Sequence, residues 1–238
     1  MSDNTRELSN KYRIAHLFAD YGVEAEVLQS IGEVHRYTID PVSSPFVAKT
    51  VKMNLMEDCP NEQYDLAVFH PKCAKWSDMP NVDSDDHENQ IPRTRELADR
   101  IADDYIIENK PQAPLINPIV LKGRMFGLPL AYKRAFETSF EVPQPPRQQS
   151  FGDKTVSPYF YSDRTTEWWM AVKGYVGDYP KQHIAKNAVP SAYMQFLTRS
   201  WLESKDTRDT NEVQDNRGPP PRDDTHQHKL KNCWVDNE

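Results

Sequence analysis

The sequence predicts an α/β fold in which helices cover both faces of a mostly parallel β-sheet. Short apolar runs alternate with amphipathic stretches along the first half of the 238-residue chain, which is the rhythm of strand–helix–strand units. The run 65–69 (DLAVF) is almost wholly apolar and is bounded by turn residues. Such a run is typical of a parallel strand that is buried on both faces.

The elements of the first half follow from apolar spacing and from stop signals. Apolar residues at positions 23, 27, 28 and 31 recur with helical spacing, and Gly32 follows them. A proline at position 92 marks the start of a second helix. In chain order we expect a strand at 13–18, a helix at 23–31, strands at 34–39, 50–55 and 65–69, a helix at 92–104 and a strand at 105–107.

The second half has shorter and less regular elements. We expect short strands at 121–130 and 135–140, and loops at 143–158 and 174–180, where prolines, glycines and polar residues gather. A final helix at 192–202 carries Tyr193, Phe196, Leu197 and Trp201 on one face. Residues 204–238 are polar, and their few apolar side chains cannot offset the entropy of ordering, so we expect a disordered tail.

Composition limits the compartment and the partners. The three cysteines, Cys59, Cys73 and Cys233, are odd in number and far apart, which argues against a disulfide framework and favours a reducing interior. The N-terminus lacks the apolar core of a signal peptide, and no run approaches the roughly 18 apolar residues of a membrane span. We therefore expect a soluble protein of the cytoplasm, which is the host cytoplasm if a virus encodes it.

The formal net charge is −7. This charge gives no general attraction to phosphate, so a protein acting on DNA would need a local basic face. Lys173, Lys181, His183 and Lys186 are the candidates for that face, although they could equally be a solvated surface. Aromatic residues at 159–161 and 168–169 either form the core of a small lobe or stack on bases.

Polar residues follow the ends of several expected strands. They are Asp20, Asp40, Asn54, Cys73 and Glu108. Ligands of open α/β sheets bind beyond the carboxyl ends of the strands, so these side chains indicate one site at that edge. Each has a plain alternative, since a lone cysteine is usually a small buried hydrophobe and a loop acid is often only solvated.

Four segments, taken in order, resemble the motif series of DNA (cytosine-5)-methyltransferases, and most closely their compact virus-encoded type. Residues 64–79 (YDLAVFHPKCAKWSDM) resemble the strand that leads to a Pro-Cys nucleophile, and Glu108-Asn109 match a Glu-Asn pair. Residues 121–140 resemble a pattern of Met-Phe-Gly followed by Arg-x-Phe-Glu-Thr-Ser, and residues 187–190 (NAVP) resemble an Asn-x-Val-Pro helix start. The resemblance covers most of residues 13–202.

The resemblance implies a Rossmann-like, S-adenosylmethionine-dependent methyltransferase sheet with a small irregular target-recognition lobe. Residues 1–140 would bind the cofactor and carry catalysis, residues 141–185 would form the lobe, and residues 186–203 would return as a helix beside the first strand. The partner would be double-stranded DNA, whose methylation can protect a viral genome from host restriction.

The same resemblance gives each site residue a role. Cys73 would attack C6 of a flipped cytosine, Glu108 would hold the edge of the base, and Arg134 would orient it. S-adenosylmethionine would then supply the methyl group to C5. The residues expected around this cofactor are Phe18, Gly22, Asp40, Asn54, Pro71 and Asn187. Asp40 has an independent reason, since an acid after the second strand can accept hydrogen bonds from ribose hydroxyls.

The chain departs from the family at the cofactor loop, where Phe-x-Gly-x-Gly-Gly is usual. Asp20 and Val23 replace two of the three glycines, and we expect them to crowd the cofactor. Lys72 replaces the second proline of Pro-Pro-Cys. A second reading is therefore a catalytically impaired relative that binds nucleic acid or protein. No metal is expected, because His70, Cys73 and His87 do not complete a four-ligand zinc site.

Overall fold

The computed structural model describes residues 12–77, 83–150 and 155–215. Cys233 and the part of the expected tail at 216–238 lie outside the described residues. The chain divides into two units, residues 1–202 and residues 203–238. All the strands belong to the first unit.

Seven strands form one sheet in the order β3-β2-β1-β4-β5-β7-β6. The first five strands along this order are parallel to one another, and β7 is antiparallel to both β5 and β6. The expected mostly parallel α/β sheet is therefore confirmed. The strands are β1 (Tyr12–Leu17), β2 (Gly32–Thr38), β3 (Lys49–Lys52), β4 (Tyr64–Phe69), β5 (Ala102–Asn109), β6 (Ile119–Lys122) and β7 (Lys133–Thr138).

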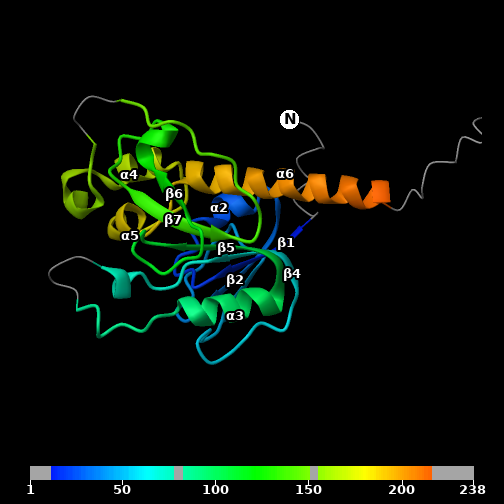
Figure 1. The fold of residues 1–238 in the computed structure, drawn as a ribbon. Helices are drawn as coiled ribbons and strands as arrows, with labels where there is room; N and C mark the ends of the chain where they lie inside the picture. Colours follow the sequence, from blue (N-terminus) through cyan, green and yellow to red (C-terminus); the bar gives the residue numbers. More distant parts are fainter. Residues whose placement is uncertain (1–11, 78–82, 151–154, 216–238) are drawn as a thin grey trace, which may run out of the picture. The chain divides into compact units, whose positions relative to one another are not determined.

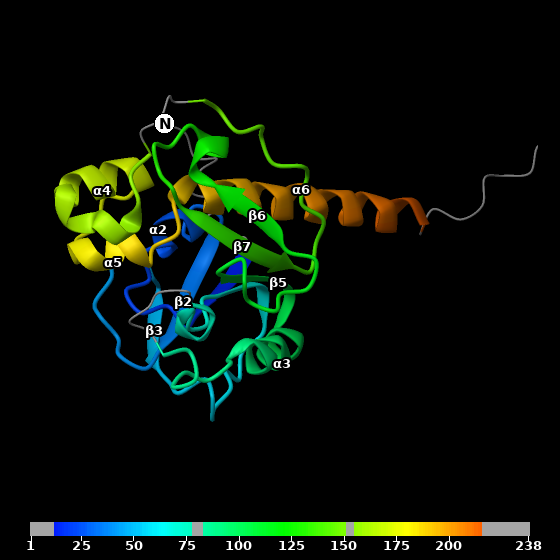
Figure 2. The same cartoon turned by 60° about the vertical axis from the view of Figure 1, so that its left-hand side comes forward.

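Helices lie on both faces of the sheet (Figure 1). α2 and α6 cover one face and α3 covers the other, while α4 and α5 lie side by side at one end of the sheet (Figure 2). The α-helices are α2 (Ala25–Leu28), α3 (Ile91–Ile101), α4 (Thr166–Lys173), α5 (Lys181–Lys186) and α6 (Ser191–Asp215), with short 3-10 helices η1 (Ala74–Trp76), η2 (Gly123–Phe126) and η3 (Pro158–Asp163). None of the helices in the described part of the chain is long and apolar enough to cross a bilayer.

Alternate residues of the central strands feed two separate cores. Ile14 and Leu66 point into the core beneath α2 and α6, whereas Leu17 and Phe69 point into the core beneath α3. The final helix packs beside the first strand, as expected, because the Trp201 and Tyr12 rings lie 4.8 Å apart. Both faces of the sheet are therefore sealed, and the strand ends are left to form a site.

Several expected elements have other bounds in the structure. The helix expected at 23–31 is regular only over α2. The amides of Ala25 at its start and of Ser30 and Ile31 beyond its end donate three residues back, to the carbonyl oxygens of Gly22, Val27 and Leu28. The strand expected at 121–130 ends at Lys122, where η2 begins. Ala102 already has extended dihedrals, so the helix expected to reach 104 ends earlier.

The expected disorder of residues 204–215 is wrong, because α6 continues to Asp215. Its first turns are packed through Tyr193, Leu197 and Trp201, all of which are fully buried. Adding one more turn to an existing helix fixes few further dihedrals for each hydrogen bond gained. A polar segment that follows a packed helix can therefore remain helical although its own composition argues for disorder.

Candidate active site

A pocket of about 380 Å³ opens at the carboxyl ends of β1, β2, β4 and β5. The structure brings all nine expected site residues to its lining. They are Phe18, Gly22, Asp40, Asn54, Pro71, Cys73, Glu108, Arg134 and Asn187. Asp20 lines it as well, so the expected convergence of polar strand ends on one edge of the sheet is confirmed.

A row of polar side chains crosses the sheet beneath this pocket. His16 is paired with Val68 on β4, and His70 lies two residues further along, so both histidines point to the face that α2 covers. Glu108 on β5 and Arg134 on β7 continue the row on the same face. β1, the end of β4, β5 and β7 thus each supply one ionisable group. The alternation of side chains along the strands places all four groups on the same face of the sheet.

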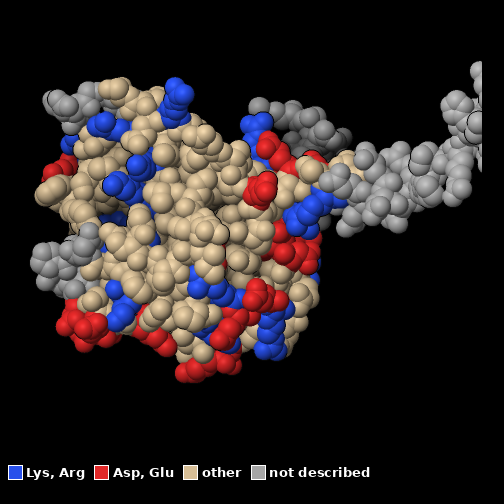
Figure 3. All heavy atoms as spheres, viewed as in Figure 1, with Lys and Arg blue, Asp and Glu red and all other residues tan. Residues whose placement is uncertain are grey.

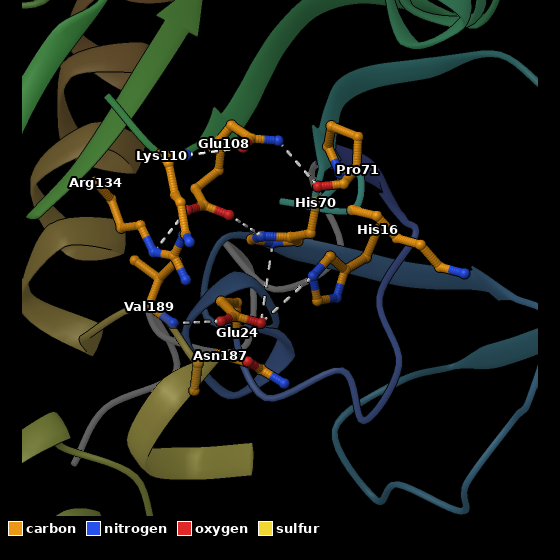
Figure 4. Close-up of polar contacts among 12 residues, drawn as sticks. His16, Glu24, His70, Pro71, Glu108, Lys110, Arg134, Asn187 and Val189 are labelled. Atoms are coloured by element: carbon orange, nitrogen blue, oxygen red, sulfur yellow. Dashed lines mark hydrogen bonds and ion pairs between the residues drawn. The ribbon is translucent and has the colours of Figure 1, made fainter. Parts of the chain in front are cut away.

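Glu108 is buried between Arg134 and His70 (Figure 4). Arg134 Nε lies 3.1 Å from Oε1, and His70 Nδ1 lies 3.2 Å from Oε2. Burial raises the pKa of Glu108, but Arg134 and His70 outweigh burial and hold the pKa below its ordinary value. Glu108 is therefore a carboxylate that can accept hydrogen bonds. Its Oε1 forms an ion pair with Arg134 but has no hydrogen-bond donor among the described residues.

Cys73 is a free, half-buried thiol at the start of η1. The loop that carries it is tied to the end of β5. The Asn109 side-chain amide donates to the Pro71 carbonyl oxygen over 3.0 Å, and Lys110 Nζ donates to Ser77 Oγ over 3.0 Å. The Glu-Asn pair thus has two structural uses, since Glu108 faces the pocket while Asn109 holds the loop that carries Cys73.

The loop after β1 has two residues in the left-handed region, Phe18 at φ 54° and Gly22 at φ 65°. A Cβ on Gly22 would lie 2.8 Å from Cδ of Arg36, so this glycine is required by both conformation and space. The expectation that Val23 crowds the cofactor is wrong, because Val23 is fully buried in the core and does not line the pocket.

Asp20 is exposed at the pocket and does not have a positive φ, so its backbone tolerates a side chain without strain. Partial burial of its carboxyl group in the pocket nevertheless raises the pKa of Asp20; Lys72 and His70 oppose this shift, and Asp40 reinforces it. Asp40 is also exposed at the pocket. Of the other expected cofactor residues, Asn54 caps its own turn through Met56, and Asn187 contacts His183.

The expected local basic face loses one of its four expected members, Lys173, whereas Lys181, His183 and Lys186 are partly exposed. Lys173 is buried, donates to the Ala188 carbonyl oxygen and lies over the Tyr132 ring, and burial and then Arg134 hold its pKa well below the ordinary value. The described residues of 119–190 nevertheless contain nine Lys or Arg against five Asp or Glu. With Arg134, Lys173 and Glu137 buried, seven cations and four anions remain at the surface or partly exposed.

Positive side chains gather over the upper left of the molecule, above the part that holds β6, α4 and α5, and acidic side chains gather along its lower edge (Figure 3). The aromatic residues of this region divide into two groups. Trp169 is buried and donates to the Tyr161 carbonyl oxygen, whereas Tyr159 and Phe160 are 54% and 64% exposed. The region therefore has both a packed interior and aromatic side chains in solvent.

Sequence reasoning missed two residues of this site, His16 and Glu24. His16 occupies an inward position near the end of β1, and Glu24 follows Gly22 in the loop and is buried. The signals available were a charged residue at the start of the expected helix and a histidine within an apolar strand. Neither has a spacing that points to a known motif.

No family model matches the sequence, and no curated protein matches it. Among solved structures, the fold is similar to a prophage-encoded protein of E. coli described as a DNA modification methyltransferase. The TM-score is 0.41 and the identity is 14%, over 63% of this chain and 53% of that chain. The chain thus spans about half the length of that structure.

Proposed function

We propose that this protein is a DNA methyltransferase that transfers a methyl group from S-adenosylmethionine to C5 of cytosine, with Cys73 as the nucleophile. The observation that carries the proposal is the meeting of Cys73, Glu108 and Arg134 in one pocket at the carboxyl edge of a mostly parallel sheet. Cys73 lies in the loop after β4, Glu108 lies on β5 and Arg134 lies on β7, and only the fold brings them together.

The pocket residues fit the proposed cofactor. The volume of about 380 Å³ lies within the range of small-molecule sites. Asp40 follows β2 and exposes an acceptor suited to ribose hydroxyls. Phe18, Gly22, Asn54, Pro71 and Asn187 would complete the cofactor's surroundings. When bound, S-adenosylmethionine supplies an electrophilic methyl group on a sulfonium sulfur.

The chain's own residues would act on the base. The Cys73 sulfur forms a bond to C6 of an extruded cytosine, and the electrons of the C5–C6 double bond make C5 nucleophilic. After C5 gains its methyl group, a base takes the C5 proton, and the sulfur–C6 bond breaks to restore the thiolate. Glu108, held ionised by Arg134 and His70, would accept a hydrogen bond from the exocyclic amine at Oε1.

Double-stranded DNA is the proposed partner. The excess of Lys and Arg around β6, η3, α4 and α5 would contact phosphates, although the whole chain is acidic. The exposed Phe160 could stack on bases or fill the gap left by the extruded one. Lys186 Nζ lies 4.5 Å from the centre of the Tyr161 ring, so η3 and α5, which borders the pocket, adjoin each other.

Sequencing of DNA from cells that express the protein tests this proposal. Bisulfite or nanopore reads should show methylcytosine in one sequence context, and Cys73→Ser should abolish it. Cys59→Ser is a matched control that should retain methylation, because Cys59 is a free cysteine outside the pocket. Unmethylated DNA in cells that contain the folded protein would contradict the proposal.

A second candidate function is binding of nucleic acid without catalysis. Asp20 favours it, since this carboxylate stands in the cofactor loop where the family has glycine. In that case purified protein would bind duplex DNA, Cys73→Ser would bind equally well, and neither would release S-adenosylhomocysteine. Binding and turnover measured on the same preparation separate the two functions.

A further inference from the structure

Three side chains beneath the pocket converge without direct hydrogen bonds to one another. Each of His16, Glu24 and His70 offers one ligand atom, and these atoms all lie within 4.8 Å of one another. Glu24 Oε2 is 3.7 Å from His16 Nε2 and 3.9 Å from His70 Nε2 (Figure 4). These separations exceed the length of a hydrogen bond.

The polar atoms of this cluster are buried and unsatisfied. His16 is fully buried, and neither of its ring nitrogens has a hydrogen-bond partner among the described residues; the same holds for His70 Nε2. An unpaired polar atom in a protein interior is destabilising, and an ion or a water usually completes its hydrogen bonds or ligation. Two of these atoms, His16 Nε2 and His70 Nε2, face Glu24 Oε2.

The other atoms of the same side chains are already held in place. His70 Nδ1 lies 3.2 Å from the Glu108 carboxylate, and Glu24 Oε1 accepts from the Val189 amide over 2.8 Å. If Nδ1 of His70 donates to Glu108, a neutral His70 presents the lone pair of Nε2 toward the Glu24 carboxylate. A metal ion between these two acceptors would bind both, in place of the proton that a charged His70 carries on Nε2.

We propose that His16, Glu24 and His70 bind a divalent transition-metal ion, with zinc as the best-suited ion. Two imidazoles and one carboxylate are an established ligand set for zinc sites that keep an open position. Ligand atoms around tetrahedral zinc lie about 3.3 Å apart. Glu24 Oε2 must therefore approach each histidine by a few tenths of an ångström, and the two histidine nitrogens, which lie within 4.8 Å of each other, must also move together. The Glu108 carboxylate on His70 is the outer partner that metal-bound histidines commonly have.

The fourth position faces the pocket. Glu24 and His70 both line the pocket that holds Cys73 and Arg134, whereas His16 closes the cluster from beneath. The nearby Lys173 Nζ already donates to the Ala188 carbonyl oxygen and lies over the Tyr132 ring. A bound ion would therefore present one exchangeable position to whatever occupies the pocket. Metal binding by these three residues would not require methyl transfer.

Metal binding by the full chain tests the proposal without DNA or cofactor. His226→Gln and His228→Gln should first be introduced, because this His-x-His pair could bind metal by itself. Chelator-treated protein should then take up one zinc ion per chain in calorimetry and in metal analysis. Glu24→Gln keeps the acceptor for Val189 and should weaken zinc binding more than tenfold, as should His70→Gln.

Three control variants should retain zinc binding. Glu26→Gln removes a carboxylate two residues from Glu24. The Glu26 carboxylate accepts from the Val176 and Gly177 amides and is not part of the cluster. Cys73→Ser and His87→Gln remove the members of the alternative His70–Cys73–His87 set. Equal zinc affinity in the parent and in both Glu24→Gln and His70→Gln, or loss of binding in Cys73→Ser, would overturn the proposal.

Cobalt absorption of the parent protein provides a second measurement if a buried variant does not fold. Cobalt(II) in the site should show the ligand-field bands of a four- or five-coordinate ion and no sulfur-to-cobalt charge-transfer band. Absence of any bound cobalt, or a charge-transfer band from thiolate, would overturn the ligand set. Failure of DNA methylation would leave both metal readouts unaffected, so the two proposals can fail separately.

Discussion

His70 Nδ1 lies 3.2 Å from Oε2 of Glu108, across the carboxyl ends of two neighbouring parallel strands. This contact joins the two parts of the site, because Glu108 also faces Arg134 while His70 also faces Glu24. Burial lowers the pKa of His70, but Glu24 and Glu108 outweigh burial and hold it above the ordinary value. The charges of the pocket therefore depend on one another.

Arg134→Met should destabilise the fold by about 3–5 kcal/mol, because it leaves the buried Glu108 carboxylate without its strongest partner. Denaturant unfolding measures this change. Lys133→Met is the matched control, since Lys133 is exposed on the same strand and its loss should change stability by less than about 0.5 kcal/mol. Equal effects of the two substitutions would show that the pair is not held in a buried environment.

Gly22→Ala should cost about 1–2 kcal/mol for the left-handed backbone alone. The new Cβ would also meet the buried Arg36 side chain, which adds to this cost. Gly127→Ala is the control, because Gly127 has a similar φ of 71°. The excess destabilisation of Gly22→Ala over Gly127→Ala in thermal unfolding measures the Arg36 contact, and no excess would mean that Arg36 moves aside.

Two aspartates of the pocket should affect cofactor affinity in opposite directions. Asp20→Asn should tighten binding of S-adenosylmethionine about fivefold, because an exposed like charge near the methionine carboxylate costs on the order of 1 kcal/mol. Asp40→Asn should weaken it about tenfold or more through loss of a charged acceptor. Calorimetry at low and high salt measures both. Weaker binding in Asp20→Asn would make Asp20 a ligand.

His183 should make the fold less stable in mild acid. Burial, followed by Lys173 and His70, lowers the pKa of His183 from 6.5 to about 4. The unfolded chain binds this proton below pH 6.5 and the folded chain only near pH 4, so stability is lost as pH falls between these values. The melting temperature of His183→Gln should fall less over this range, and parallel curves would contradict the assignment.

Phe160→Ala should weaken binding of duplex DNA by about 1–3 kcal/mol, the usual contribution of one aromatic stack on a base. Fluorescence anisotropy measures the affinity. Val176→Ala is the control, because Val176 is 86% exposed and apolar but offers no ring. Equal affinities of the two variants for duplex DNA would show that Phe160 is not part of the protein surface that binds DNA.

The sheet was predictable from local patterns, and so was the meeting of its strand ends. Buried parallel strands such as 64–69 consist of nearly continuous apolar residues, and their carboxyl ends must share one edge. Cys73 and Glu108 could therefore be placed in one pocket from sequence. The length of α6 could not, because it depends on the packing of Trp201 and its neighbours and not on the composition of 204–215.

The His16–Glu24–His70 cluster could not be predicted for a different reason. Its members lie on β1, in the loop before α2 and after β4, and only the strand register aims them at one point. Lys173 was misjudged for the same reason, since a lysine at the end of a helix looks solvated until the neighbouring Tyr132 and Ala188 are placed. Long-range packing decides both outcomes.

Trapping of the covalent intermediate tests the central claim most directly. Duplex DNA containing 5-fluorocytosine has no C5 proton to lose, so attack by Cys73 in the presence of S-adenosylmethionine should leave a stable protein–DNA adduct. We expect denaturing gels and mass spectrometry to show this adduct in the parent protein and in Cys59→Ser, and to show none in Cys73→Ser. An adduct that persists in Cys73→Ser, or no adduct in the parent protein, would contradict the account.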